Sequence, residues 1–178
     1  MQLTPIMERF ILHWGEMGTR WGVNRSVAQI HALLYLSPTP LPADEITEIL
    51  SIARSNVSTS LKELQSWGLV RVAHVLGDRR DHFETDKDMW VLFTKIVEER
   101  KRREIDPTLS VLRQCMMDAE ADTETPAEIK QRIGNTLDFL ESMTDWYERV
   151  KLLPHPTLSR LMKMGDKVAR LIKKKRRE

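Results

Sequence analysis

The stretch RSNVSTSLKELQSWGLVRV, residues 54–72, decides the fold of this chain. It begins with an arginine and several short polar side chains, continues with leucines at helical spacing, and ends in a glycine and an apolar segment. Ser, Thr and Asn are less favourable than Ala or Leu inside a helix by about a few tenths of a kcal/mol each. Helix propensity therefore does not account for this composition. The short polar residues must instead serve a role of the outward face of the helix.

The two faces of this helix differ in chemistry. Val57, Leu61 and Leu64 share one face, and the residues opposite them are hydroxyl-bearing or basic and include no carboxylate. Short hydroxyls let a helix approach a groove of duplex DNA closely, and Arg, Asn and Lys donate to phosphates and base edges. The sequence therefore predicts DNA-binding residues on this helix, which are Arg54, Ser55, Asn56, Ser58, Thr59 and Lys62.

A short helix precedes this stretch and an extended segment follows it. Residues 43–50, ADEITEIL, have acids in the first turn, where the helix dipole favours them, and only SIA separates them from Arg54. Two short helices joined this tightly are typical of a helix-turn-helix. Residues 69–76, LVRVAHVL, and residues 81–85, DHFET, are rich in strand formers. A hairpin directly after a helix-turn-helix predicts a winged helix.

Charged residues lie at the tip of the predicted hairpin. GDRR contains the turn residues Gly77 and Asp78, followed by Arg79 and Arg80. Both arginines are predicted DNA-binding residues that reach a minor groove or phosphates, and the pattern leaves open which of them enters the groove. Phosphate would repel Asp78, so we expect this carboxylate to orient an arginine. The alternative is an ordinary hairpin whose charged tip protects a sheet edge.

The rest of the chain is helical by pattern. Asn24 is a suitable N-cap for an apolar-spaced helix over residues 25–37. We expect a mainly α fold with a small β-hairpin wing. Its expected parts are an N-terminal helix (1–22), a winged helix-turn-helix DNA-binding domain (23–86) and a helical C-terminal region for dimerisation with a possible ligand-sensing role (87–178).

The C-terminal region is expected to contain several amphipathic helices. Asp106 and Pro107 are suited to be an N-cap and a first helical residue, so we expect the helix to kink or restart there. Apolar residues recur over 129–150, and a last helix is expected over 158–172. Long amphipathic helices must bury their apolar faces, and a second copy of the chain is the economical partner. The sequence therefore predicts a homodimer.

Composition limits the class of protein. The chain has 178 residues, of which 41% are hydrophobic, which is enough for a packed core. A single cysteine, Cys115, excludes an internal disulfide and fits a reducing compartment. No apolar run approaches the roughly 18 residues that span a bilayer. We expect a cytoplasmic protein that does not enter a membrane.

Catalytic motifs are missing from the sequence. The five histidines fall singly, no glycine-rich phosphate loop is present, and no Ser or Cys lies in a nucleophile motif. His74 and His82 can approach each other across the hairpin, but two ligands do not form a metal site. We therefore expect no enzyme, and no catalytic, metal or cofactor-binding residues.

Three segments resemble a known family. They are FILHWGEMGTRWGVNRSVAQIHALLYLS, LPADEITEILSIARSNVSTSLKELQSWGLV and VLGDRRDHFETDKDMWVLF, between Phe10 and Phe93. Their order resembles the MarR-type winged-helix regulators, and their detail is most similar to the GbsR-like branch. The resemblance implies a homodimeric transcriptional regulator, usually a repressor, that binds an inverted repeat of double-stranded DNA and is released by a small-molecule effector.

Individual residues match the family's motifs. Asp78 and Arg80 match its Asp-x-Arg wing motif, and the matches on the DNA-reading helix are Arg54, Ser55, Asn56, Ser58 and Thr59. Two positions depart from the pattern. Many members have a serine at the start of this helix and a glycine in the turn, where this chain has Ala53 and Ser51. Ala53 has no side chain that can cap the helix.

The resemblance also raises the question of a ligand. It implies that some GbsR-like relatives respond to choline or glycine betaine, and an aromatic cage holds a quaternary ammonium through cation–π attraction. Aromatic residues at helical spacing are also common in an ordinary core. The residues of a possible ligand pocket are Trp14, Trp21, Trp90, Phe93, Trp146 and Tyr147.

Two other functions remain open at this stage. A winged helix can dock proteins, but docking favours apolar side chains on the outward face of residues 50–67, where this chain has Ser, Thr and Lys. A non-specific architectural DNA-binding protein would bind unrelated duplexes with similar affinity.

Overall fold

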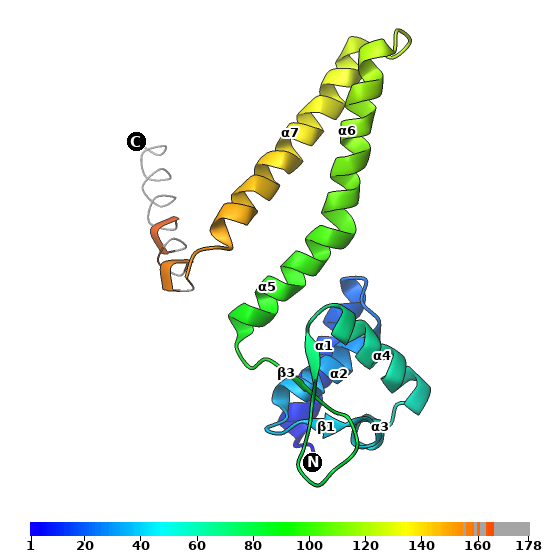
Figure 1. Cartoon of the computed structure of the whole chain (residues 1–178), viewed down its shortest axis with the longest axis vertical. Helices are drawn as coiled ribbons and strands as arrows, with labels where there is room; N and C mark the ends of the chain where they lie inside the picture. The colour runs from blue at the N-terminus through cyan, green and yellow to red at the C-terminus, as the bar shows by residue number, and fades with distance from the viewer. Residues whose placement is uncertain (155, 159, 161–162, 166–178) are drawn as a thin grey trace. The chain divides into compact units, whose positions relative to one another are not determined.

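The computed structural model describes residues 1–154, 156–158, 160 and 163–165, in two compact units, Met1–Glu99 and Arg100–Glu178. The described part is mainly helical and contains one small three-stranded sheet, which confirms the expected fold class (Figure 1). Most of the last expected helix, 158–172, lies outside the described residues. In the described part, no helix combines the length and the hydropathy needed to cross a bilayer.

Five helices form the first unit around one core. Asn24 caps the second helix by accepting a hydrogen bond from the Ser26 amide at 2.8 Å, as predicted. Gly18 lets the first two helices approach closely, because a Cβ there would lie 2.5 Å from the Cβ of Ala28. The helices are α1 (Pro5–Arg20), α2 (Arg25–Leu36), α3 (Ala43–Leu50), α4 (Arg54–Ser66) and α5 (Met89–Arg100).

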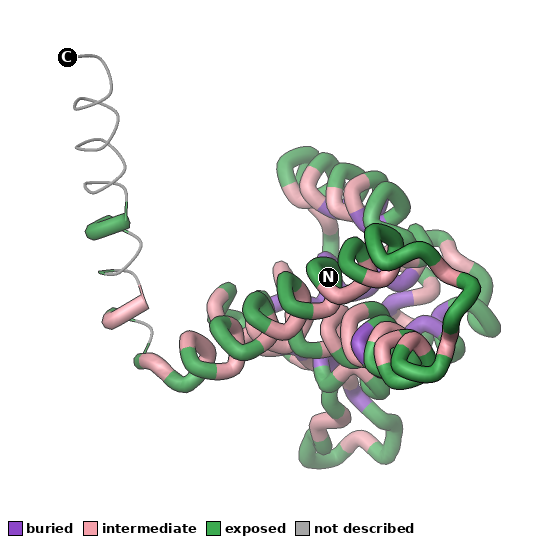
Figure 2. Tube along the Cα trace, turned by 90° about the horizontal axis from the view of Figure 1, so that it is seen from above, coloured by how far each residue is buried: buried purple, intermediate pink, exposed green. Residues whose placement is uncertain are grey.

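The second helix, α2, supplies the centre of the core. Ile30, Leu33 and Leu34 are at most 1% exposed, and full burial of such a side chain contributes about 1.5–3 kcal/mol. Ile11 of α1 and Leu92 of α5 belong to the same buried cluster. The compact unit therefore extends beyond residues 23–86 at both ends, because those flanking helices complete its core. Figure 2 shows this burial along the chain.

The sheet has the order β1-β3-β2, with β1 (Leu41–Pro42), β2 (Val70–Ala73) and β3 (His82–Thr85). The hairpin pairs β2 with β3 as the sequence predicted, and the loop between them, residues 74–81, is the wing. Sequence analysis missed β1, which pairs with β3 and places Leu41 opposite Phe83. A strand of two residues is too short to show an alternating pattern, and its proline is tolerated because β1 lies at an edge.

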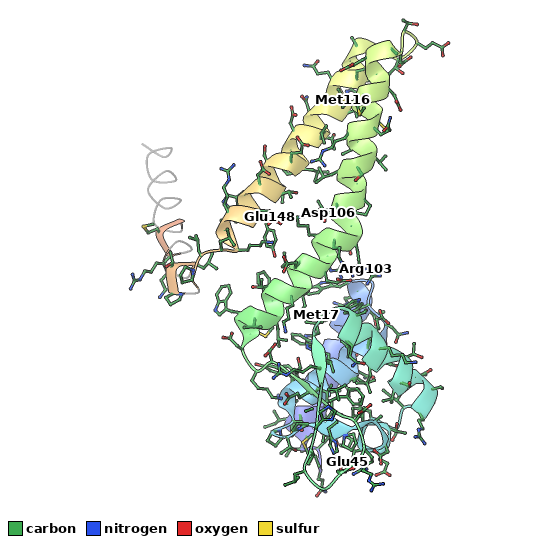
Figure 3. All side chains as sticks on the ribbon, in the orientation of Figure 1. Met17, Glu45, Arg103, Asp106, Met116 and Glu148 are labelled. Atoms are coloured by element: carbon green, nitrogen blue, oxygen red, sulfur yellow. The ribbon has the colours of Figure 1, made fainter. Side chains whose placement is uncertain are left out.

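Two helices form most of the second unit, α6 (Asp106–Ala121) and α7 (Ala127–Val150), and they pack along each other. The helix changes character before Asp106, where a kink or restart was expected, and α6 begins at this residue, but the predicted N-cap role of Asp106 is wrong because Ile105 occupies the N-cap position. A π-helical segment, Lys101–Ile105, leads directly into α6, and this wider turn accommodates Pro107, which lacks an amide N–H. The Asp106 carboxylate does not cap α6 but accepts a hydrogen bond from Lys101 at 2.8 Å; Lys101 also lies 3.5 Å from Glu148 of α7 (Figure 3).

Candidate nucleic-acid interface

The outward face of α4 is polar and open to solvent. Val57, Leu61 and Leu64 are buried, as the helical pattern predicted. All six residues predicted to contact DNA from this helix are exposed, which are Arg54, Ser55, Asn56, Ser58, Thr59 and Lys62. The only acid of α4, Glu63, is half-buried. The helix therefore presents hydroxyl, amide and cationic donors on one carboxylate-free surface.

The start of α4 has no side-chain cap. Ala53 occupies the N-cap position, and no side chain accepts a hydrogen bond from the first amides of the helix. These amides and the positive end of the helix dipole favour an anion. Ser51, in the turn before α4, has a φ of 52°, in the left-handed region. Glycine adopts this conformation without strain, so the glycine that the family resemblance implies at this place would fit the turn.

Within the wing, Asp78 holds Arg80 in a fixed orientation. The Asp78 carboxylate accepts the backbone N–H of Arg80 at 2.9 Å. It also accepts guanidinium hydrogen bonds from Nη2, to Oδ2 at 2.6 Å, and from Nε, to Oδ2 at 3.0 Å and Oδ1 at 3.1 Å. These bonds hold the pKa of the Asp78 carboxyl well below its ordinary value. The prediction that Asp78 orients an arginine is confirmed.

A second carboxylate binds the same arginine. Nη1 of Arg80 donates to Oδ2 of Asp44 at 2.6 Å, and Asp44 lies in the first turn of α3. This hydrogen bond lowers the pKa of the Asp44 carboxyl, and the two carboxylates together raise the pKa of Arg80. Arg79, in contrast, is exposed and makes no hydrogen bond or ion pair within the described part of the chain.

Buried and charged contacts connect the strands of the hairpin to the rest of the unit. Arg71 of β2 pairs with Glu84 at 2.9 Å and with Asp86 at 3.2 Å, and Lys95 of α5 pairs with Asp86 at 2.6 Å. On the other side of the hairpin, His31 Nε2 lies 3.3 Å from the Thr85 hydroxyl. Burial, together with the charge of Lys87, lowers the pKa of His31 to about 4, so this histidine is neutral at physiological pH.

Sequence analysis missed two residues at this site, Asp44 and Lys87. The Lys87 ammonium donates to the carbonyls of Leu34 at 2.5 Å and Ser37 at 2.7 Å, and so satisfies the C-terminal end of α2. The only signal for Asp44 was its position in a helix first turn. The chain separation of 36 residues between Asp44 and Arg80 leaves no local pattern to read.

The hairpin histidines do not form a metal site. His82 is buried, and its Nδ1 lies 2.9 Å from the Arg80 carbonyl oxygen, so its ring supports the wing. Among the described residues, no group of three or more His, Cys, Asp or Glu residues is placed to hold a metal ion.

The six aromatic residues of the possible ligand pocket lie in different places. Trp90 and Phe93 contact each other edge to face at 6.2 Å, whereas Trp14 stacks on Phe10 instead. Trp21 is 55% exposed. Of the two residues in the second unit, Trp146 is 65% exposed and Tyr147 lies 5.8 Å from the Lys151 ammonium. A quaternary-ammonium cage from these residues stays a prediction.

Comparisons with known proteins agree with this geometry. Residues 21–81 match the family model of the MarR family. The chain is 25% identical over 136 residues to the "HTH-type transcriptional repressor GbsR" of Bacillus subtilis (strain 168), and the match covers 75% of each protein. A solved structure described as a transcriptional regulator superposes with a TM-score of 0.64 at 18% identity, covering 89% of this chain and 99% of that one; this likeness shows the fold.

Residues 21–81 therefore form a winged helix that matches the family model of the MarR family, and its helix α4 presents an exposed polar face. Within this class, the chain is similar to GbsR, which confirms the resemblance seen in the sequence. The matched proteins are regulators and not enzymes, in agreement with the expectation from the missing catalytic motifs.

Proposed function

We propose that this protein is a homodimeric repressor that binds a specific inverted repeat in double-stranded DNA. The observation that carries the proposal is the carboxylate-free polar surface of α4, with every predicted contact residue exposed. Hydroxyls and amides read base edges, whereas Arg54 and Lys62 neutralise phosphates. The uncapped start of α4 adds amide donors for a phosphate. The name of the relative GbsR supports repression.

Dimerisation is supported by an apolar stripe on α7. Phe139, Met143 and Trp146 follow the spacing i, i+4, i+7 and are 61%, 53% and 65% exposed. Other residues of α7 face α6, so α6 does not cover this stripe. A second copy of the chain buries such a surface under twofold symmetry. Two copies of α4 would then enter successive major grooves about 34 Å apart, which requires an inverted repeat.

An effector is a further part of the proposal. The resemblance of the sequence to the GbsR-like branch implies a quaternary-ammonium ligand such as choline or glycine betaine. The exposed rings of Trp21, Phe93 and Trp146 are surfaces on which such a cation can stack. A ligand of this kind would act by changing the separation of the two α4 helices. The single cysteine, Cys115, fits action in the cytoplasm.

The two alternative functions are less well supported. A protein-docking module requires an apolar outward face on α4, and the exposed residues of this helix are polar. A non-specific architectural protein is distinguished by experiment, since a regulator prefers its operator by about 10³-fold or more.

The experiment that tests the proposal is selection of bound sequences from a random duplex library at physiological salt, where backbone attraction is held down. We expect recovery of an inverted repeat whose half-sites lie about one DNA turn apart. The selection is repeated with choline or glycine betaine present, which should reduce recovery. A library that shows no enrichment under either condition would contradict sequence-specific DNA binding.

A further inference from the structure

We infer that Asp44 is a brake on DNA binding: it holds the wing arginine, Arg80, in an internal ion pair that a DNA phosphate must displace. The inference rests on the proposed DNA-binding function and assigns to it a residue outside both α4 and the wing. Asp44 lies in the first turn of α3, and its Oδ2 accepts a hydrogen bond from Arg80 Nη1 at 2.6 Å.

Asp44 is not needed to orient the arginine. Asp78 already binds both Nη2 and Nε of Arg80 and also accepts its backbone N–H. A guanidinium held on one edge by a carboxylate fork has a fixed plane. The contact with Asp44 occupies Nη1, which Asp78 leaves open. The contact with Asp44 therefore occupies a hydrogen-bond donor, Nη1, that would otherwise face the solvent.

The charge of this cluster also opposes DNA. Asp44 and Asp78 are two carboxylates against the single guanidinium of Arg80, so the three side chains together are net negative. A net negative cluster at the wing repels the phosphate backbone. When Arg80 leaves Asp44 for a phosphate, its guanidinium neutralises one more negative charge of the DNA. Asp44 and Arg80 are each 50% exposed, so this exchange requires no unfolding.

Asp44→Asn tests the brake, with Glu45→Gln as the matched control. Glu45 lies in the same first turn of α3, so its substitution removes the same charge from the same helix end. Figure 3 labels Glu45 on this helix. Affinity for the selected duplex is measured by fluorescence anisotropy over a series of salt concentrations. Asp44→Asn is expected to bind about three- to fivefold more tightly than Glu45→Gln, the size of one exposed ion pair.

The salt dependence separates a new phosphate contact from a loss of charge alone. One additional contact steepens the dependence of log affinity on log salt by about 0.9. We expect this change for Asp44→Asn and not for Glu45→Gln. In a chain that also has Arg80→Ala, adding Asp44→Asn should change affinity no more than Glu45→Gln does. Thermal unfolding of both variants shows whether α3 is equally stable.

The outcomes separate the inference from the proposed function. If the parent chain binds its selected duplex specifically but Asp44→Asn matches Glu45→Gln, or binds more weakly, the brake is wrong and DNA binding stands. A parent chain that binds selected and unrelated duplexes equally well overturns both.

Discussion

Helix α4 and the wing present their charges in opposite ways. On α4, the cations Arg54 and Lys62 stand on a surface without carboxylates. In the wing, Arg80 is bound by two carboxylates and only Arg79 is left to face the solvent without a partner among the described residues. The comparison indicates that α4 is ready to bind a polyanion, whereas the wing must first exchange an internal partner.

The largest effect is expected from placing carboxylates on α4. Replacing Ser58 and Thr59 together with Glu puts two negative charges against the DNA, and specific binding should be lost, by about 3 kcal/mol or more. Both residues are exposed, so the free energy of unfolding should change by less than about 0.5 kcal/mol. Anisotropy with the selected duplex measures the binding, and urea unfolding measures the stability.

The control for this variant adds the same charge elsewhere. Ser110 and Gln114 are exposed on α6, and replacing both with Glu should leave most of the affinity intact. Equal losses in the two variants would mean that net charge, and not the position of α4, controls binding.

Alanine substitutions of the two wing arginines, Arg79 and Arg80, should affect DNA binding in different ways. Arg80→Ala should weaken operator binding by about 1–3 kcal/mol, because its oriented guanidinium, once released from Asp44, lies at the edge of the groove and contacts both base edges and the adjacent phosphate. Arg79→Ala should weaken binding to all duplexes similarly and reduce the salt slope by about one, as a phosphate contact does. Anisotropy with the operator and with an unrelated duplex separates the two effects. If Arg79→Ala alone relaxes sequence preference, then Arg79 enters the groove and the assignment must be exchanged.

The stability of the first unit should depend on pH through His31, which contacts Thr85 of β3. Its pKa is lowered to about 4 in the folded protein, whereas a histidine in the unfolded chain has a pKa of about 6.5. The unfolded chain therefore binds more protons between these values, so stability is present above pH 6.5 and falls as the pH decreases toward 4. Between pH 7 and pH 5, His31 should account for a loss of about 2 kcal/mol.

Urea unfolding at both pH values measures this loss, and His31→Gln should remove most of it. His13, which is exposed on α1, provides the control, since His13→Gln should leave the loss unchanged. A parent chain equally stable at pH 7 and pH 5 would contradict a buried neutral imidazole at this place.

The sequence was sufficient for features that repeat locally. The alternation of Val57, Leu61 and Leu64 with short polar residues predicted α4 and its exposed face, and the turn residues around Gly77 predicted the hairpin. Both depend on neighbours within a few positions, where propensity and periodicity act. The fold class followed from the order of these elements.

Features that depend on distant partners were not accessible in this way. The contact between Asp44 and Arg80 joins two elements through side-chain geometry, and β1 exists only because β3 lies beside it. The segment Lys101–Ile105 has no distinguishing composition that separates a π turn from an α-helix. Aromatic residues at helical spacing are more common in a core than in a pocket, and spacing does not show which of the six lie together; the structure brings Trp90 and Phe93 into ring contact.

The smallest effect is expected in the turn before α4. Ser51 adopts the left-handed conformation with a φ of 52°, which costs a non-glycine residue roughly 1–2 kcal/mol, while glycine adopts it freely but loses more backbone entropy on folding. Ser51→Gly should therefore stabilise the protein by only about 0.5–1 kcal/mol, measured by urea unfolding. Operator affinity should not change, because this substitution leaves the exposed face of α4 intact. Ser110→Gly within α6 should have the opposite sign, since there the backbone is helical. If both glycine variants are destabilised, the backbone at Ser51 is not strained. The turn between α3 and α4 is then held by the packing of the two helices alone.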